Sequence, residues 1–360
     1  MIINISRTKN FQSCRQFAWN WDELRLAPQR EADPLIVGEG YHLGSEIISQ
    51  SANVQDAMKA AEARMRERYA GQLILPEERP DIERNIEFVK RAVEQWAINY
   101  DRADFRVLWP EVNGCVALPN TEHHCWFVHR ILHPDIPYHQ CPMEVEGDGL
   151  PEDWDEDEQR CVQPHFFKFR TDGIIEMYKK VWLLEQKTTS RDDDKFWAKW
   201  NLEFQTRGYC YGVWKTTGVR VSGFLLNAII KHSKQVTING QRKYQLDPTN
   251  VGFGREPYLV TEEDLADFEH DITGLANAYE EAFCDKAHNP KSLKIFKNTE
   301  ACFDWNRRCQ YWELCKRHQQ VHEGEFRTRS NDYVNNEYYT LLGLPILEDK
   351  PCHEASTNAK

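Results

Sequence analysis

The sequence predicts an α/β fold in which a mixed central sheet is flanked by helices. Good helix formers with helical spacing of apolar residues occupy 52–70, 82–100 and 261–284. Runs rich in aromatic and β-branched residues lie between them and predict strands. The length of 360 residues allows two or three domains, or one large α/β domain with insertions.

The other elements follow from the same patterns. Residues Gly38 to Tyr41 are expected to precede a helix that begins near His42. A helix is expected at 194–216, and the tail after about residue 325 reads as polar and loosely attached. The expected strands cover 104–131, 165–172, 173–178, 180–186 and 219–231.

The helix at 261–284 has a recognisable start. Thr261 is the expected N-cap, and Asp264 stands where a full capping box has Glu or Gln, so that box is expected to be partial. Acidic residues in the first turn suit the positive end of the helix dipole.

Four segments are expected along the chain. They are an N-terminal segment (1–35), a core (36–260), a C-terminal helical segment (261–325) and a polar tail (326–360). Within the core, residues 144–158 carry nine acidic side chains and no basic one, which predicts an exposed loop.

Composition narrows the class of protein. Hydrophobic residues make up 41% and aromatic residues 12%, which argues against a disordered chain. No apolar run approaches the roughly 20 residues of a membrane span. The start of the chain has no apolar signal stretch, so a cytoplasmic location in a bacterial or phage-infected cell is expected. Eleven cysteines without such a signal do not predict a disulfide framework.

The most informative segment is FRTDGIIEMYKKVWLLEQKTTS, which reads as strand, turn and strand. Asp172 is expected to end the first strand, and Glu185 and Lys187 project from one face of the second. Two carboxylates beside an ammonium suit a Mg²⁺ or Mn²⁺ site, with the lysine stabilising phosphorane charge or orienting the attacking water. The alternative is a surface strand pair with ordinary charges.

Three further residues point to the same place. Gln205 and Tyr209 are four apart and share one face of the helix after this strand. His42 is a candidate additional metal ligand. Taken singly, a histidine or a Gln/Tyr pair is more often structural.

These motifs together resemble the RecB-type branch of the PD-(D/E)XK nuclease superfamily, over roughly residues 10–316. The resemblance implies a PD-(D/E)XK nuclease core and metal-dependent cleavage of DNA. It makes His42, Asp172 and Glu185 metal ligands and Lys187 catalytic together with the two carboxylates, while Gln205 and Tyr209 support the site. The long region between His42 and Asp172 departs from the pattern. The motifs are G-x-x-x-H (Gly38 to His42), DG (Asp172, Gly173), E-x-K (Glu185, Lys187) and Q-x-x-x-Y (Gln205, Tyr209).

A second constellation consists of cysteines. Cys302, Cys309 and Cys315 are spaced more widely than the C-x₂-C knuckles of common zinc modules, and a four-thiolate site needs a distant fourth, for which Cys14 is the natural candidate. RecB-type nucleases, the related CRISPR-adaptation nuclease and phage exonucleases of this branch show a similar arrangement. That resemblance implies a [4Fe–4S] cluster that joins the two chain ends. Zinc would also fit, and four free thiols are the alternative.

Charge is unevenly distributed along the chain. The net charge is −12, yet residues 160–235 contain 14 Lys/Arg against 7 Asp/Glu. This window predicts a path for DNA phosphates. Its tryptophans are expected in the core more than in base stacking. The candidate path consists of Lys168, Arg170, Lys179, Lys180, Lys199, Arg207, Lys215 and Arg220.

The expected function is therefore Mg²⁺- or Mn²⁺-dependent hydrolysis of DNA, by an exonuclease acting on single strands or ends. One alternative is an inactive nuclease-fold DNA-binding subunit of a recombination, repair or defence complex. Another is a metalloprotein whose cluster transfers electrons. The sequence has no G-x-x-x-x-G-K-[ST] motif for an ATP motor, so a helicase or recombination partner is possible.

Overall fold

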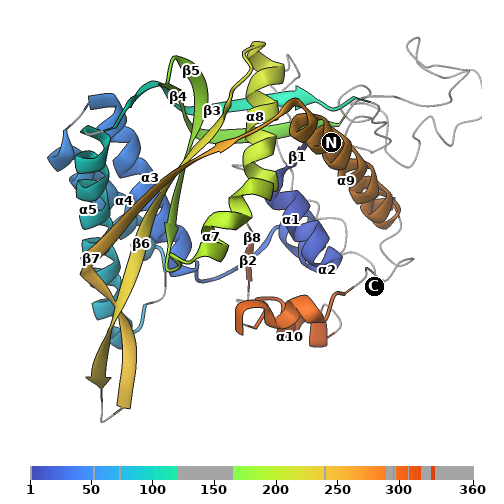
Figure 1. Cartoon of the computed structure of the whole chain (residues 1–360). Helices are drawn as coiled ribbons and strands as arrows, with labels where there is room; N and C mark the ends of the chain where they lie inside the picture. Colours follow the sequence, from blue (N-terminus) through green and yellow to red (C-terminus); the bar gives the residue numbers. More distant parts are fainter. Residues whose placement is uncertain are drawn as a thin grey trace, which may run out of the picture.

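A six-stranded mixed sheet forms the centre of the computed structural model, and helices cover both of its faces (Figure 1). The strand order is β1-β4-β5-β6-β7, and β3 also pairs with β4. The structure describes residues 2–51, 53–72, 74–101, 103–119, 165–238, 241–288, 295, 297–306, 308–317 and 326–328. The strands are β1 (Ile2–Asn4), β2 (Leu26–Pro28), β3 (Phe105–Ala117), β4 (Phe166–Met177), β5 (Lys180–Thr189), β6 (Gly223–Ile238), β7 (Gln241–Leu259) and β8 (Phe326–Thr328).

Two clusters of buried hydrophobic side chains lie between the sheet and its helices, one on each face of the sheet. One contains side chains from α3, α4 and α5, and the other contains side chains from α1, α8 and α9. This architecture confirms the expected mixed α/β fold. The helices are α1 (Ile5–Ser13), α2 (Arg15–Ala18), α3 (Asp33–Ser51), α4 (Val54–Ala70), α5 (Arg79–Asp101), α7 (Asp194–Ala198), α8 (Phe204–Thr217), α9 (Glu262–His288) and α10 (Trp312–Lys316). Shorter turns lie at Trp19–Glu23, Pro76–Glu78, Lys199–Leu202 and Glu300–Asn306.

The glycine-rich segment around His42 is helical, contrary to the expectation that Gly38 to Tyr41 precede the helix. Helix α3 begins at Asp33, nine residues before His42. A β-carbon on Gly40 would lie 2.7 Å from Met65 of α4, and one on Gly44 would lie 2.3 Å from Val93 of α5. These glycines therefore allow close helix packing, which outweighs their low helix propensity.

The expected break between strands at Asp172 and Gly173 is also wrong. Strand β4 is continuous from Phe166 to Met177, and the chain turns at Tyr178 and Lys179, which both have positive φ. The pairing of β4 with β5 runs from Met177–Lys180 to Gly173–Leu184. Asp172 therefore lies inside a strand and beside Glu185 of the next one.

The long hairpin of β6 and β7 is more extensive than the sequence indicates. A strand was expected at 219–231, whereas β6 reaches Ile238 and pairs antiparallel with the 19-residue β7. The distal half of this hairpin is mostly polar, and its few apolar residues give only a short apolar–polar alternation, which is a weak strand signal. The acidic segment 144–158 lies outside the described residues.

Segments near the two ends of the sequence meet. Strand β1 joins the central sheet by parallel pairing with β4, and β2 pairs antiparallel with β8. The start of the expected polar tail is thus a short strand. None of the described helices is both long and apolar enough to cross a membrane.

Candidate functional site

Asp172 lies at an irregular position in β4. Phe167 and Phe169 pack in the same hydrophobic cluster as Ile174, although strict alternation would place residue 174 on the opposite face. The Thr171 hydroxyl accepts a hydrogen bond from the Gly173 N–H (3.2 Å) and donates one to the Gly173 carbonyl (3.1 Å). Such irregularities re-aim side chains and are common near active sites.

The strands β4 and β5 separate at this point, and the Asp172 carboxylate fills the gap. Its Oδ2 accepts a hydrogen bond from the backbone N–H of Gln186 at 2.7 Å, and its Oδ1 lies 3.3 Å from Nδ1 of His42. Glu185, on β5, forms an ion pair with Lys187 two residues later on the same strand. The separation of two strands thus brings α3, β4 and β5 together.

Helix α8 completes the group from the other side. The Gln205 side-chain amide donates hydrogen bonds to the Tyr209 hydroxyl (2.8 Å) and, at 3.4 Å, to the Glu185 carboxylate. Close packing of α8 depends on Gly212, where a β-carbon would lie 2.3 Å from the Phe169 ring. The structure therefore brings together six side chains that we call the carboxylate cluster: His42, Asp172, Glu185, Lys187, Gln205 and Tyr209.

Burial and charge act against each other in the carboxylate cluster. Burial raises the pKa of Glu185 to about 6, against the lowering effect of Lys187. Burial also favours the neutral form of Asp172, but His42, Lys187 and the Gln186 N–H together hold its pKa below the usual range. The same carboxylates raise the pKa of Lys187 and of His42 although burial opposes this. Glu185 is only 2% exposed, whereas the Lys187, Asp172 and His42 side chains are 28%, 22% and 35% exposed. In the carboxylate cluster, Glu185 is therefore buried, whereas Lys187, Asp172 and His42 are accessible at its rim.

Three contributors to this site were not assigned to it from the sequence. The Gln186 N–H binds Asp172, the Trp200 ring centroid lies 5.9 Å from Lys187 Nζ, and Tyr41 is fully buried beside the Asp172 charge. Burial first, and then Asp172, raises the pKa of Tyr41, which keeps it a neutral phenol. Of these three, only Gln186 could have been found from the sequence, because it lies between Glu185 and Lys187 of the E-x-K motif.

The expected phosphate path does not form one free surface. Arg207 and Lys215 of α8 pair with acidic residues of α9, and Arg220 pairs with Glu262. Lys179 and Lys180 lie at the β4–β5 turn. Trp200 is buried, and Trp197 and Trp214 pack against the core, as expected.

The four cysteines predicted to act together line one cavity of about 190 Å³, which we call the cysteine pocket. Cys14 lies between α1 and α2, and Cys302 lies in the turn Glu300–Asn306. Cys309 precedes α10, and Cys315 lies within it. The lining also includes Phe17, Lys297, Thr299, Tyr311, Trp312 and Lys316.

Backbone N–H groups point at two of these sulfurs. Asn298 donates to Cys14 Sγ at 3.4 Å, and Tyr311 donates to Cys309 Sγ at 3.5 Å. Burial, reinforced by the neighbouring cysteines, raises the pKa of Cys302 and brings that of Cys309 to about 11. Without a bound cation, therefore, these two are neutral thiols at pH 7.

Neither in the carboxylate cluster nor in the cysteine pocket do the side chains already converge on a single metal position. Among the described residues, no three His, Cys, Asp or Glu side chains are gathered closely enough to hold a single ion. In the carboxylate cluster, Lys187 and His42 hold the carboxylates instead.

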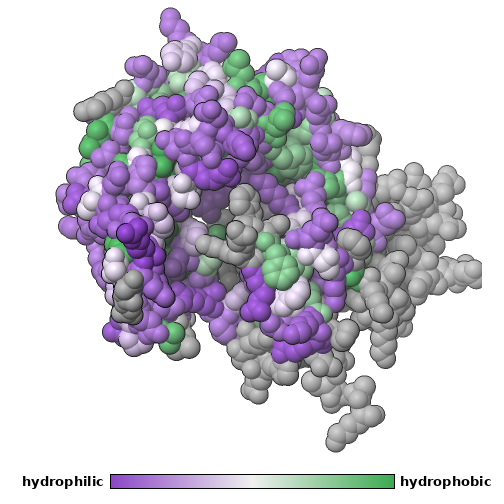
Figure 2. All heavy atoms as spheres, turned by 60° about the horizontal axis from the view of Figure 1, so that its bottom comes forward, coloured by the Kyte–Doolittle hydropathy of each residue, from purple (hydrophilic) through white to green (hydrophobic). Residues whose placement is uncertain are grey.

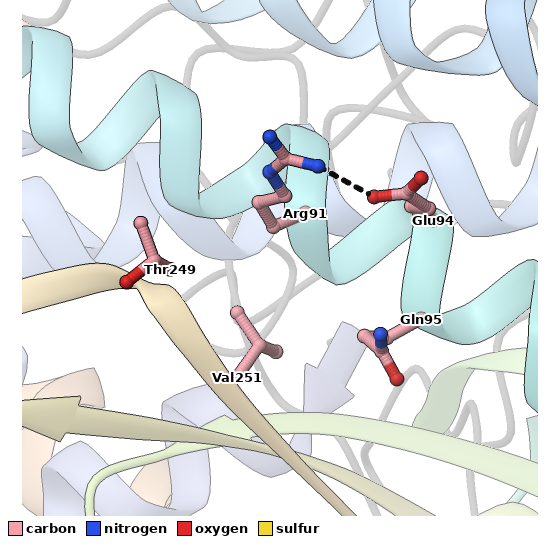
Figure 3. A pocket seen from close by; sticks show the side chains of 5 residues that line it. All are labelled: Arg91, Glu94, Gln95, Thr249 and Val251. Atoms are coloured by element: carbon pink, nitrogen blue, oxygen red, sulfur yellow. Dashed lines mark hydrogen bonds and ion pairs between the residues drawn. The ribbon is translucent and has the colours of Figure 1, made fainter.

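A further cavity of about 200 Å³ lies between α5 and β7 and is lined by Arg91, Glu94, Gln95, Thr249 and Val251 (Figure 3). Arg91 donates to Glu94 at 3.0 Å. None of the predicted site residues lines it.

Comparison with known proteins gives little further information. No family model and no curated protein matches the chain. One solved structure, of a candidate exonuclease from Eubacterium rectale, is 12% identical and covers 93% of each chain, with a TM-score of 0.38. A likeness this distant carries no argument about fold or activity here.

Proposed function

We propose that this protein is a metal-dependent nuclease that hydrolyses phosphodiester bonds in single-stranded DNA or at DNA ends. The observation that supports this most is the convergence of Asp172, Glu185 and Lys187 where β4 and β5 separate. The two carboxylates are the oxygen donors that suit Mg²⁺ or Mn²⁺, and His42 would add an imidazole nitrogen. When bound, such an ion polarises a phosphoryl oxygen and lowers the pKa of bound water.

The protein's own groups have distinct tasks in this proposal. Lys187 presents its ammonium at the rim, where it stabilises negative charge that develops on the phosphate oxygens. Gln205 positions the buried Glu185 carboxylate, and Tyr209 accepts the second hydrogen bond of that amide. The Gln186 N–H orients Asp172 and favours its charged form.

The test is digestion of end-labelled single-stranded DNA with Mg²⁺, Mn²⁺ or EDTA. Cleavage should require the metal and be lost in Glu185→Gln. Glu176→Gln is the matched control, because Glu176 is an exposed β4 residue paired with Arg106. Metal-independent cleavage, or full activity in Glu185→Gln, would contradict the proposal. DNA binding without any cleavage would favour the inactive DNA-binding subunit.

We also propose that the cysteine pocket holds a [4Fe–4S] cluster that joins the chain ends. The cavity of about 190 Å³ is many times the ~10–15 Å³ that one water needs, which suits a polynuclear cluster better than one ion. Lys297 and Lys316 in the lining complement four thiolates.

Anaerobic purification followed by metal analysis tests this assignment. The expected result is brown protein with close to four irons per chain. A colourless protein with one zinc would keep the ligands and reject the cluster.

A further inference from the structure

The distal half of the β6–β7 hairpin extends beyond the sheet. Pairing of β5 with β6 ends at Thr189–Ile230, whereas β6 continues to Ile238 against β7. We call the segments Ser233–Ile238 and Gln241–Leu246 the arm. It projects away from the helices at the lower left of Figure 1. None of the described side chains of the arm is fully buried, and Leu246, at the base of the arm, packs partly against the hydrophobic core.

Charge distinguishes this region from the rest of an acidic chain. Residues 204–246 contain seven Lys/Arg and no Asp or Glu. The first three of these cations are paired with acidic residues of α9. On the arm, Lys234 lies 3.3 Å from Asp247, while Arg242 and Lys243 pair with no carboxylate among the described residues.

The pairing register shows which side chains act together. Gln235 lies opposite Tyr244 and Thr237 lies opposite Arg242, so one face carries Arg242 beside Tyr244. Tyr244 is 75% exposed. Lys243 lies on the other face. A guanidinium next to an exposed ring matches a nucleic-acid strand, in which phosphates alternate with bases that can stack.

The position of the arm relative to the carboxylate cluster follows from the strand pairing. Strands β5 and β6 are parallel, with Lys187 opposite Ala228. Gln235, the partner of Tyr244, lies seven residues beyond Ala228, which is about 23 Å along a strand. That distance corresponds to roughly seven nucleotides of a strand that keeps the stacked spacing of about 3.4 Å each. Figure 2 views the side toward which the arm points, and its surface is predominantly hydrophilic.

We propose that the arm holds single-stranded DNA about seven stacked nucleotides from the scissile phosphate. Arg242 and Lys243 bind phosphates, and Tyr244 stacks on a base. This inference rests on the proposed nuclease function and adds where the strand is held.

The test compares two triple variants. Arg242→Ala/Lys243→Ala/Tyr244→Ala removes the binding groups of the arm. Tyr178→Ala/Lys179→Ala/Lys180→Ala removes one tyrosine and two cations from the β4–β5 turn, at the opposite end of β5, where Tyr178 is 71% exposed. Binding of fluorescein-labelled 5- and 20-nucleotide single strands is measured by anisotropy in EDTA, and thermal melting checks the fold of both variants.

The wild-type protein should bind the 20-mer more tightly than the 5-mer, and the arm variant should lose most of that gain. For the 20-mer we expect at least ~10-fold weaker binding and a salt slope lower by about 1.4, because two phosphate contacts are removed. The β4–β5 turn variant should match the wild type.

An arm variant that binds the 20-mer like the wild type would overturn the inference, as would equal losses for both lengths. Failure of the nuclease proposal looks different. In that case no metal releases product from the wild type, while the loss of 20-mer binding in the arm variant persists.

Discussion

The carboxylate cluster and the cysteine pocket differ in what holds their ligands in place. The first lies on long elements, the strands β4 and β5 and the helices α3 and α8, and each carboxylate already has protein partners. The second is assembled from α2, α10 and one short turn, which have four, five and seven residues. The carboxylate cluster is therefore formed by the fold itself, whereas the cysteine pocket rests on shorter elements that the proposed metal cluster would join.

The largest expected effect is on the stability of the cysteine pocket. Cys14→Ser should remove the bound metal and lower the free energy of unfolding by about 2–5 kcal/mol, the scale of losing a native cross-link that closes a long loop. Metal content and urea unfolding measure this. Cys115→Ser is the control, because Cys115 is a half-buried free thiol on β3 outside the pocket. Full metal content in Cys14→Ser would exclude Cys14 as a ligand.

In the carboxylate cluster, substitution of Lys187 should affect the rate of DNA cleavage far more than the stability of the protein. Lys187→Ala should slow cleavage at least ~100-fold, because it removes a charge that acts mainly in the transition state. Thermal melting should change little, since Glu185 can take up a proton once its cation is gone. Lys180→Ala, at the exposed start of β5, should cleave normally. Wild-type rates in a folded Lys187→Ala protein would contradict the catalytic role.

Rigid support of the carboxylate cluster can be tested through helix packing. Gly212→Ala should destabilise the protein by about 1–3 kcal/mol, because the new methyl would meet the Phe169 ring. It should also reduce cleavage, since α8 carries Gln205 and Tyr209. Gly274→Ala is the matched control on α9. Its β-carbon would meet nothing within 4 Å, so a gain of up to about 1 kcal/mol is expected. Equal effects of both substitutions would argue against close packing of α8.

The smallest expected effect concerns the start of α9. Asp264 accepts hydrogen bonds from the Thr261 N–H and hydroxyl, both at 2.8 Å, and Thr261 accepts one from the Asp264 N–H at 3.1 Å. The capping box expected to be partial is thus complete. Asp264→Asn should cost about 0.3–1 kcal/mol at pH 7, because it removes a negative charge from the first turn of the helix.

This cost should depend on pH in a defined direction. Burial opposes ionisation of Asp264, but Thr261 and Arg207 lower its pKa below the usual value. A lowered pKa stabilises the folded state above about pH 4, and that contribution disappears as the pH falls through the folded-state pKa. Urea unfolding at pH 7 and near pH 3 should therefore show the difference from wild type shrinking. Glu263→Gln, in the same exposed turn, is the matched control.

Local patterns predicted most of the regular elements. Helices α4 and α5 begin and end within a few residues of the expected 52–70 and 82–100, because their apolar spacing is regular. The boundaries failed where glycines serve packing: α3 continues through Gly40, and β4 continues through Gly173. At Gly40 and Gly173 the residues that approach the place of the missing side chain, Met65 and Trp109, are distant in sequence, so the local pattern could not reveal them.

The sequence by itself determined the residue types of both sites and the order of their motifs. Tertiary structure decided which contacts bring the residues of each site together. The separation of β4 from β5 places the Gln186 N–H on Asp172, and chain segments nearly 300 residues apart bring Cys14 to the other three cysteines. It also determined which cations are neutralised by α9 and which remain on the arm. These outcomes depend on distances between segments far apart in the chain, whereas sequence periodicity reports only on near neighbours.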